Sequence, residues 1–470
     1  MSPSRPLSFC AAVLALAASA PADVRLPKLF TDGMVLQRDA QFPVWGWADK
    51  GERVVVEIGS SRRTTTADSA GRWVLTMPPL AASTKPLTLV VQGRNRVEVG
   101  DVLIGEVWVC SGQSNMEWPV SASENAEKEV AEANDPRIRM FTVVRASSPI
   151  PATDCDGRWQ AAGPETVGRF SAVGYFFARE LRRALGVPVG MINASWGGTP
   201  AEAWTPLREI ERGSELGPLL ARLDDSGVHP AAKPSYLFNG MIAPLIPYRI
   251  RGVIWYQGES NVGRAWQYRT LFPTMVQGWR KAWGRGDFPF YYVQIAPYRY
   301  NAPEACAELR EAQAHALRLR NTGMVVTMDI GDVNDIHPRN KQEVGRRLAL
   351  WALAKDYGKN VTFSGPLFEK MTVVGHEARI SFRYAEKGLA TSDGKAPSDF
   401  QIAGADRKFV PAHARIDGSQ VVVWADGIEH PVAVRYAWSD LANPNLVNGN
   451  GLPASPFRTD DWPAVTRDAK

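Results

Sequence analysis

Residues 105–116 read Gly-Glu-Val-Trp-Val-Cys-Ser-Gly-Gln-Ser-Asn-Met. The apolar run predicts a buried strand, the glycine a tight turn, and the residues from Ser114 onward the first turn of a helix. A strand that leads through a short turn into a helix is the first half of a βαβ unit. We therefore expect an α/β domain to be built around this stretch.

Further apolar runs and two amphipathic patterns extend this expectation. Within residues 171–185, Val173, Phe177 and Leu181 share one helical face, and the segment after His337 has similar spacing. Strand-like runs alternate with such patterns, which indicates a mainly parallel sheet between two layers of helices. We predict this three-layer domain over residues 101–360, with strands at 102–110, 189–193, 253–256, 290–295 and 324–328.

The segments on either side have a different pattern of apolar and polar residues. Residues 23–100 contain short alternating runs such as 54–58 and 87–91, separated by Gly, Asp, Pro and Ser. This pattern predicts a small N-terminal β domain that resembles a sandwich. A similar β-rich region is expected over 361–470, ending in a tail rich in Pro, Asn and Asp that wraps a surface.

The composition is that of a globular protein and argues against nucleic acid as a partner. The formal net charge is +5, from 54 Lys and Arg against 49 Asp and Glu, and no basic cluster stands out. Sixteen Trp and twelve Tyr are more than a core of this size needs. Flat rings can serve as platforms for sugars, although most of these residues are expected to pack in the core.

The first 22 residues resemble a secretory signal. One charge, Arg5, precedes an apolar run at 9–17 and a set of small residues. This run is too short to span a bilayer, and no later segment is long and apolar enough to do so. We expect a secreted or periplasmic protein without a membrane span. After cleavage Cys110, Cys155 and Cys306 remain, which allows at most one internal disulfide.

Polar residues gather where the predicted parallel strands end, at the edge of the sheet where ligands bind. Backbone N–H groups at the helix start near Ser114 lack helical partners and can stabilise an oxyanion, although an ordinary N-cap serine would fit as well. Gly197 and Gly198 allow close backbone approach to a ligand. After the strand at 253–256, Gln257 can donate to an oxyanion and Glu259 can orient its neighbours, unless both belong to a structural network.

A base is required before a serine hydroxyl becomes a good nucleophile. Among six histidines, only His337 lies beside carboxylates at a predicted strand-to-helix junction. A nearby aspartate can fix the tautomer of the imidazole and stabilise the imidazolium. The His and Cys residues show no zinc-like spacing, so neither a metal nor another cofactor is expected.

Four segments together resemble the SGNH hydrolase superfamily, and in particular its sialate O-acetylesterase family. The matching blocks are Gly112-Gln113-Ser114-Asn115-Met116, Trp196-Gly197-Gly198-Thr199, Tyr256-Gln257-Gly258-Glu259-Ser260-Asn261 and Asp335-Ile336-His337-Pro338. The resemblance implies an SGNH/flavodoxin-like fold and a serine esterase that removes O-acetyl groups from sugars. The acetylated sugar is the implied partner; acetylated sialic acid and acetylated xylan or another plant glycan both remain open.

The resemblance also implies the role of each residue. Ser114 is the nucleophile, His337 the general base and Asp335 the acid of the triad. Two departures leave alternatives open, because Gln257 stands where the superfamily has Asn, and Asn334 where it has Asp, so Asp332 competes with Asp335. The remaining roles implied are an oxyanion hole formed by Ser114, Gly197, Gly198 and Gln257, and substrate-binding candidates Gln113, Asn115, Trp196 and Glu259.

Two other classes of protein compete with the esterase. A glycoside hydrolase would use two carboxylates, for which Glu259, Glu202 and Asp335 are available. It would explain neither Ser114 nor His337. A non-catalytic carbohydrate-binding protein would explain the aromatic residues, but not a serine and a histidine at the ends of neighbouring strands.

Overall fold

The computed structural model describes residues 23–469, so the leader expected at 1–22 lies outside the described residues. At the centre is a mixed sheet with strand order β13-β12-β11-β7-β10-β8-β9. All neighbouring pairs are parallel except β8 with β9. The strands are β7 (Arg96–Gly112), β8 (Asp135–Thr142), β9 (Trp159–Ala162), β10 (Val189–Ser195), β11 (Gly252–Tyr256), β12 (Phe290–Val293) and β13 (Thr322–Val325).

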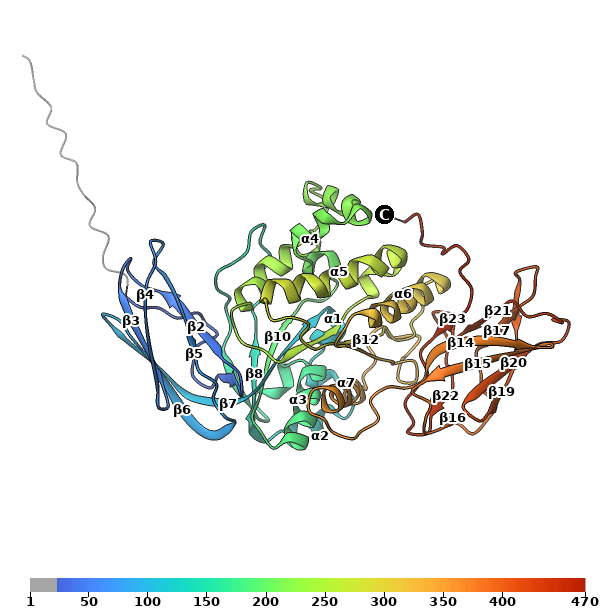
Figure 1. Cartoon of the computed structure of the whole chain (residues 1–470), viewed down its shortest axis with the longest axis horizontal. Helices are drawn as coiled ribbons and strands as arrows, with labels where there is room; N and C mark the ends of the chain where they lie inside the picture. Colours follow the sequence, from blue (N-terminus) through green and yellow to red (C-terminus); the bar gives the residue numbers. More distant parts are fainter. Residues whose placement is uncertain (1–22, 470) are drawn as a thin grey trace, which may run out of the picture.

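Helices cover both faces of this sheet (Figure 1). On one face lie α3 (Ala172–Leu185) and α7 (Lys341–Lys355), on the other α5 (Ala265–Trp283) and α6 (Pro303–His315). Successive residues of β7 point to opposite layers, because Trp108 belongs to the core that holds α3 and α7 whereas Val109 belongs to the core that holds α5. The predicted three-layer α/β fold is confirmed.

Local sequence explains the boundaries of the best predicted helix. The Ser171 hydroxyl accepts a hydrogen bond from the Gly174 N–H (3.1 Å) and caps α3, and Gly186 ends it with a φ of 73°. All five predicted central strands are present within a few residues of their expected positions. Strands β8 and β9 were not predicted, because β8 begins Asp-Pro-Arg and β9 has only four residues.

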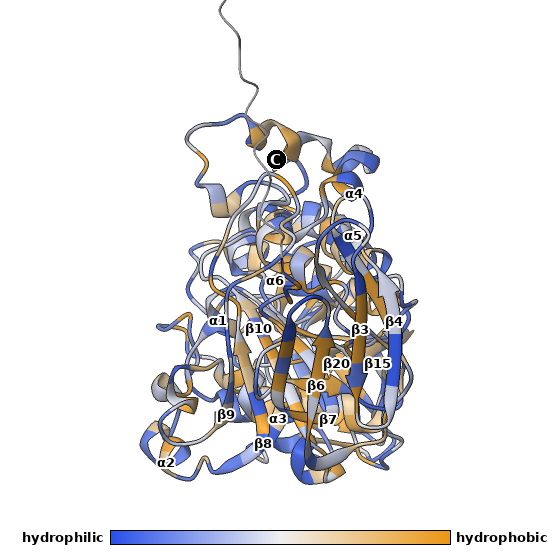
Figure 2. Cartoon of the chain, turned by 90° about the vertical axis from the view of Figure 1, so that its left-hand side faces the viewer, coloured by the Kyte–Doolittle hydropathy of each residue, from blue (hydrophilic) through white to orange (hydrophobic). Residues whose placement is uncertain are grey.

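The N-terminal β region is joined to the central sheet through one long strand. Strand β7 starts at Arg96, so it crosses the expected domain boundary at residue 100, and the division into domains remains a prediction. In Figure 2 the edge strand β4 (Ser61–Thr66) is largely hydrophilic, as suits an edge exposed to water. The other strands are β1 (Val35–Gln37), β2 (Phe42–Trp47), β3 (Arg53–Ile58), β5 (Arg72–Met77) and β6 (Ser83–Gln92).

The C-terminal region forms further antiparallel sheets. One has the order β14-β15-β20-β19 and another β18-β17-β21-β23, while β16 pairs with β22. The strands are β14 (Leu367–Val374), β15 (Glu377–Arg383), β16 (Leu389–Thr391), β17 (Phe400–Ala403), β18 (Phe409–Pro411), β19 (His413–Asp417), β20 (Gln420–Trp424), β21 (Ala433–Tyr436), β22 (Leu446–Asn448) and β23 (Phe457–Arg458).

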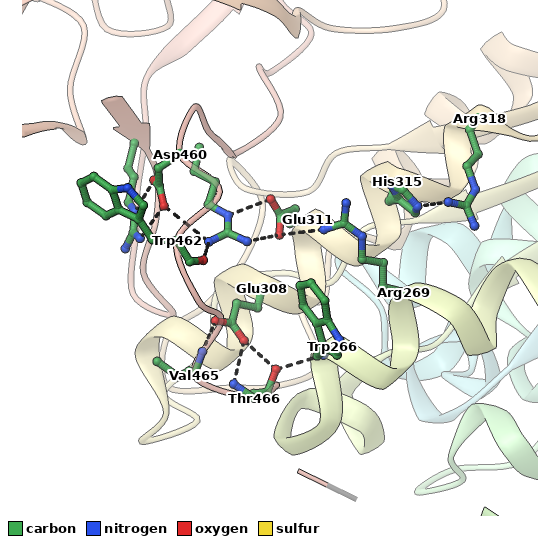
Figure 3. A network of polar contacts seen from close by, with 12 residues as sticks. Trp266, Arg269, Glu308, Glu311, His315, Arg318, Asp460, Trp462, Val465 and Thr466 are labelled. Atoms are coloured by element: carbon green, nitrogen blue, oxygen red, sulfur yellow. Dashed lines mark hydrogen bonds and ion pairs between the residues drawn. The ribbon is translucent and has the colours of Figure 1, made fainter. Parts of the chain in front are cut away.

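The tail beyond β23 is fastened to helix α6 (Figure 3). At the end of β23, Arg458 forms two hydrogen bonds with the Glu311 carboxylate. Glu308 is buried and accepts hydrogen bonds from the Val465 N–H and from both the N–H and the hydroxyl of Thr466. The expected wrapping of the tail is in line with these contacts.

Two further expectations concern cysteines and membranes. Cys110, Cys155 and Cys306 are buried and free, so no disulfide links them. Among the helices in residues 23–469, none combines the length and the apolar character needed to cross a bilayer.

Candidate active site

The turn that precedes Ser114 is shaped by the close approach of two strands. Gly112 ends β7 with a φ of 140°, and a Cβ atom there would lie 2.1 Å from the Tyr256 carbonyl oxygen of β11. Only glycine fits this position. The chain then turns, and Ser114 begins the short helix α1 (Ser114–Glu117) at the end of the central strands.

The structure brings Ser114 and His337 together. The Nε2 atom of His337 lies 2.9 Å from the Ser114 Oγ atom, which is hydrogen-bonding distance. His337 lies in the loop between β13 and α7, so both residues follow strands of the same sheet. The pair has the geometry of a serine nucleophile and its base.

Asp335 is the carboxylate beside this histidine. Its Oδ1 accepts a hydrogen bond from the His337 backbone N–H (2.9 Å) and lies 3.8 Å from Nδ1, which is too long for a hydrogen bond to the ring. The competing Asp332 instead accepts a hydrogen bond from the Asn334 backbone N–H. Asp335 is therefore the better placed of the two for an electrostatic role.

The environment favours the neutral imidazole that a base requires. Burial and the nearby charge of Lys341 lower the pKa of His337 below its ordinary value of 6.5, whereas Asp335 raises it. The Trp118 ring is stacked on the imidazole, with 4.6 Å between the ring centroids and 15° between the planes. This stacking restricts the orientation of the ring.

The two candidate glycines differ in what their N–H groups can bind. The Gly197 N–H donates to Glu117 Oε2 (2.9 Å), and Glu117 is paired with Arg145. Gly198 is exposed, and among residues 23–469 no acceptor lies at its N–H or at that of Ser114. Of the three expected backbone donors, those of Ser114 and Gly198 are therefore free, and that of Gly197 is occupied by a carboxylate.

Gln257 has no exposed surface, and its amide has partners on all sides. Its Nε2 donates to Asn261 Oδ1 (2.7 Å) and to the Thr199 carbonyl (3.3 Å), and its Oε1 accepts from the Tyr268 hydroxyl (3.0 Å). Both amide hydrogens are used in this arrangement. Its expected role as an oxyanion donor remains a prediction.

The four substrate-binding candidates do not lie on one open surface. Gln113 is buried, and its amide oxygen accepts from backbone N–H groups of the Gly258–Ser260 turn. Asn115 is buried, and its side chain donates to Glu259 Oε1 (2.6 Å). Trp196 is partly exposed, with the Arg145 guanidinium 5.5 Å from its ring centroid. Of the four, Trp196 is the best placed to meet a ligand.

Sequence reasoning missed four residues that the fold brings to this site: Glu117, Trp118, Arg145 and Lys341. Glu117 and Trp118 follow Ser114 by three and four positions, and Lys341 follows His337 by four, so inspection of the flanking helical turns could have found them. No local signal points to Arg145, which lies in a loop.

Glu202, one of the carboxylates that a glycosidase could use, is not accessible to a ligand. Glu202 has no exposed surface and is bound by Arg264 (2.5 Å) and by the Asn261 amide (3.0 Å). In the part of the chain that the structure describes, no cluster of three His, Cys, Asp or Glu side chains could hold a metal ion.

Comparison with known proteins agrees with this geometry. A family model described as carbohydrate esterase, sialic acid-specific acetylesterase, matches residues 104–354. The sialate O-acetylesterase of Homo sapiens is 30% identical over 93% of this chain and 93% of its own length, and that of Rattus norvegicus is 30% identical over 86% and 88%.

A solved structure of a carbohydrate acetylesterase from Xanthomonas citri superposes with a TM-score of 0.88 and 41% identity, and covers 93% of this chain and 100% of that one. Because the family model matches more than half of the chain and the human protein aligns with 93% of it, the chain belongs to the carbohydrate esterase family of sialic acid-specific acetylesterases and is an ester hydrolase.

Proposed function

We propose that this protein removes O-acetyl groups from sugars through an acetyl-enzyme on Ser114. The observation that carries the proposal is the 2.9 Å contact between Ser114 Oγ and His337 Nε2. The family and the similarity to a carbohydrate acetylesterase from Xanthomonas citri support the choice of an acetylated sugar as substrate.

The chemistry follows from that contact. His337 Nε2 takes the proton from Ser114 as Oγ attacks the acetyl carbonyl carbon, and the carbonyl oxygen becomes an oxyanion. When the tetrahedral intermediate collapses, the bond to the sugar oxygen breaks and His337 gives its proton to that oxygen. Water activated by His337 then attacks the acetyl-enzyme, which releases acetate and returns the proton to Ser114. Asp335 stabilises the imidazolium across 3.8 Å.

For the oxyanion we favour the backbone N–H groups of Ser114 and Gly198. Both lack another acceptor among the described residues, whereas the Gly197 N–H already donates to Glu117. Each donor that points at the oxyanion is worth about 10²–10³-fold in rate. Gln257 would become a third donor only by giving up its hydrogen bond to Thr199 or Asn261.

An acetylated sialic acid is the first substrate to test, because the curated relatives that align over most of the chain are sialate O-acetylesterases. An acetylated neutral glycan such as xylan is the second, because the Xanthomonas citri relative is described only as a carbohydrate acetylesterase. Acetate release from both, measured under the same conditions, separates the two.

The test of the mechanism compares Ser114→Ala with Ser260→Ala, since both serines lie in the blocks that resemble the family. We expect Ser114→Ala to abolish acetate release and covalent labelling by a fluorophosphonate, and Ser260→Ala to retain both. Labelling of the Ser114→Ala variant at another serine, together with retained hydrolysis, would refute the proposal.

We also infer export from the cytoplasm, which rests on the leader-like composition of residues 1–22. Fusing this segment to a reporter that is active only outside the cytoplasm tests it. Export of the reporter supports the inference, and retention contradicts it.

A further inference from the structure

Asn115, the residue after the nucleophile, connects three of the four sequence blocks. Its Nδ2 donates to Glu259 Oε1 (2.6 Å) and to the Ile336 carbonyl oxygen (2.9 Å). Its Oδ1 accepts a hydrogen bond from Lys341 Nζ (2.5 Å). Every polar atom of the side chain thus has a partner, and only 1% of the residue is exposed.

These contacts bear directly on the distance between nucleophile and base. Asn115 is adjacent to Ser114, and Ile336 is adjacent to His337. Besides the Ser114–His337 contact, the described residues form two hydrogen bonds between helix α1 and residues 331–341. Both involve the Asn115 side chain. A shift of either segment would change the position of Oγ relative to Nε2.

Burial of the two charged partners of Asn115 is unfavourable in free energy. Lys341 has no exposed surface and begins helix α7, where the helix dipole disfavours a cation. The Glu259 Oε2 atom is buried and has no hydrogen-bond partner among the described residues. Lysine is almost never fully buried unless it is paired, and local rules of this kind are broken mainly at functional sites.

Charge compensation makes the arrangement possible. Lys341 lies close enough to Glu259 for each charge to favour the other, and its Nζ is 5.2 Å from the Tyr256 ring centroid. Asn115 lies between the two charges and bonds to both, so its amide has one orientation: oxygen towards the ammonium and nitrogen towards the carboxylate.

We propose that Asn115 is a positioning residue that, held between Glu259 and Lys341, fixes the nucleophile turn to the histidine loop and so sets the Ser114–His337 geometry. The proposal rests on the proposed function, because it assigns a task within the same catalytic step. Asn115 and Glu259, which were expected to bind substrate, would then support the reacting residues instead of contacting the substrate.

Asn115→Ala tests this directly. We expect kcat for acetate release and the rate constant of fluorophosphonate labelling to fall about 10²-fold, since a displacement of about 1 Å between reacting groups costs this much. KM should change less than about threefold, because Asn115 is only 1% exposed and so is shielded from a bound substrate. A purely structural role would lower the melting temperature without this split between kcat and KM.

Asn448→Ala is the matched control. Asn448 is equally buried and also bonds in both directions, to the Ser364 carbonyl and from the Leu452 N–H, but it lies in β22, outside the catalytic α/β region. It should lose thermal stability while the labelling rate constant of the folded protein stays at the wild-type value.

A second pair of variants keeps the proposal testable if Asn115→Ala does not fold. Glu259→Gln removes the charge opposite Lys341 but retains an oxygen that accepts from Asn115, so it should lower kcat clearly less than Glu259→Ala does. Glu259→Ala removes the acceptor and should lower kcat at least about tenfold with little change in KM.

The outcomes separate the two proposals. Wild-type kcat and labelling in a folded Asn115→Ala, or equal effects of Glu259→Gln and Glu259→Ala, would overturn the positioning role and leave the esterase intact. Retained hydrolysis by Ser114→Ala would instead overturn the proposed function, and with it the positioning role.

Discussion

Ser114 and His337 are 223 positions apart in the sequence, and their side chains meet at 2.9 Å. Two strands of one parallel sheet produce this contact, because β7 and β13 end at the same edge and each leads into a loop that carries one partner. If the contact is catalytic, removing either partner alone should lower kcat nearly as much as removing both, since the two residues act as a unit.

We therefore expect Ser114→Ala, His337→Ala and the double variant each to lower kcat for acetate release at least about 10³-fold, with similar residual rates. Initial rates on an acetylated sugar measure this. His413→Ala is the control, because this imidazole lies in β19 of the C-terminal region and packs against Trp424. Multiplicative losses in the double variant would show that the two residues act independently.

The choice between Asp335 and Asp332 can be tested by matched changes to asparagine. Asp335 raises the pKa of His337, so Asp335→Asn should lower that pKa and move the acid limb of the kcat/KM profile to lower pH. Because Asp335 is 3.8 Å from Nδ1, the loss in kcat should be well below the roughly 10⁴-fold seen where an aspartate bonds the ring.

Asp332→Asn should leave both the pH profile and kcat unchanged, because this carboxylate binds the Asn334 backbone. The reverse pattern, with the shift in Asp332→Asn, would assign the acid of the triad to Asp332.

Lys341 acts on the same histidine with the opposite sign. Burial lowers the pKa of Lys341 to about 7, and its charge in turn lowers the pKa of His337. Lys341→Met removes this cation, so the pKa of His337 should rise and the acid limb of kcat/KM should move to higher pH. Lys355→Met, at the other end of helix α7, should leave the limb in place. A shift to lower pH in Lys341→Met would contradict this account.

The sequence predicted the fold and the meeting of Ser114 with His337, because both depend on local patterns. Apolar runs mark the strands, Gly-Gln-Ser directly follows one of them and Asp-Ile-His lies in the loop after another, and parallel strands bring such segments to one edge. The order of the strands follows less directly, since β10 lies beside β7 although α3 and two further strands intervene in the chain.

Other features of the site depend on contacts between distant segments. A glycine N–H at position 197 looks free in the sequence, and only the fold shows that Glu117 occupies it. Asn115 and Glu259 read as polar residues available to a ligand. In the fold Asn115 donates a hydrogen bond to Glu259 and accepts one from Lys341. Tertiary packing, which no local pattern records, decides these roles.

The tail offers a test of stability that is separate from catalysis. Glu308 of helix α6 is only 4% exposed and accepts three hydrogen bonds from Val465 and Thr466 (Figure 3). Glu308→Ala leaves these donors without their acceptor, which should lower the free energy of unfolding by about 2–3 kcal/mol. It should also speed hydrogen exchange in residues 460–469, because the tail loses its attachment.

Glu304→Ala is the matched variant on the same helix. Its carboxylate is 52% exposed and approaches Arg435 only to 3.8 Å, so its removal should change the unfolding free energy by less than about 0.5 kcal/mol. Urea unfolding and hydrogen exchange measure both variants. Because neither glutamate contacts Ser114 or His337, kcat should stay at the wild-type value in both. Equal stability of the two variants would mean that water satisfies the Val465 and Thr466 donors and that Glu308 does not hold the tail.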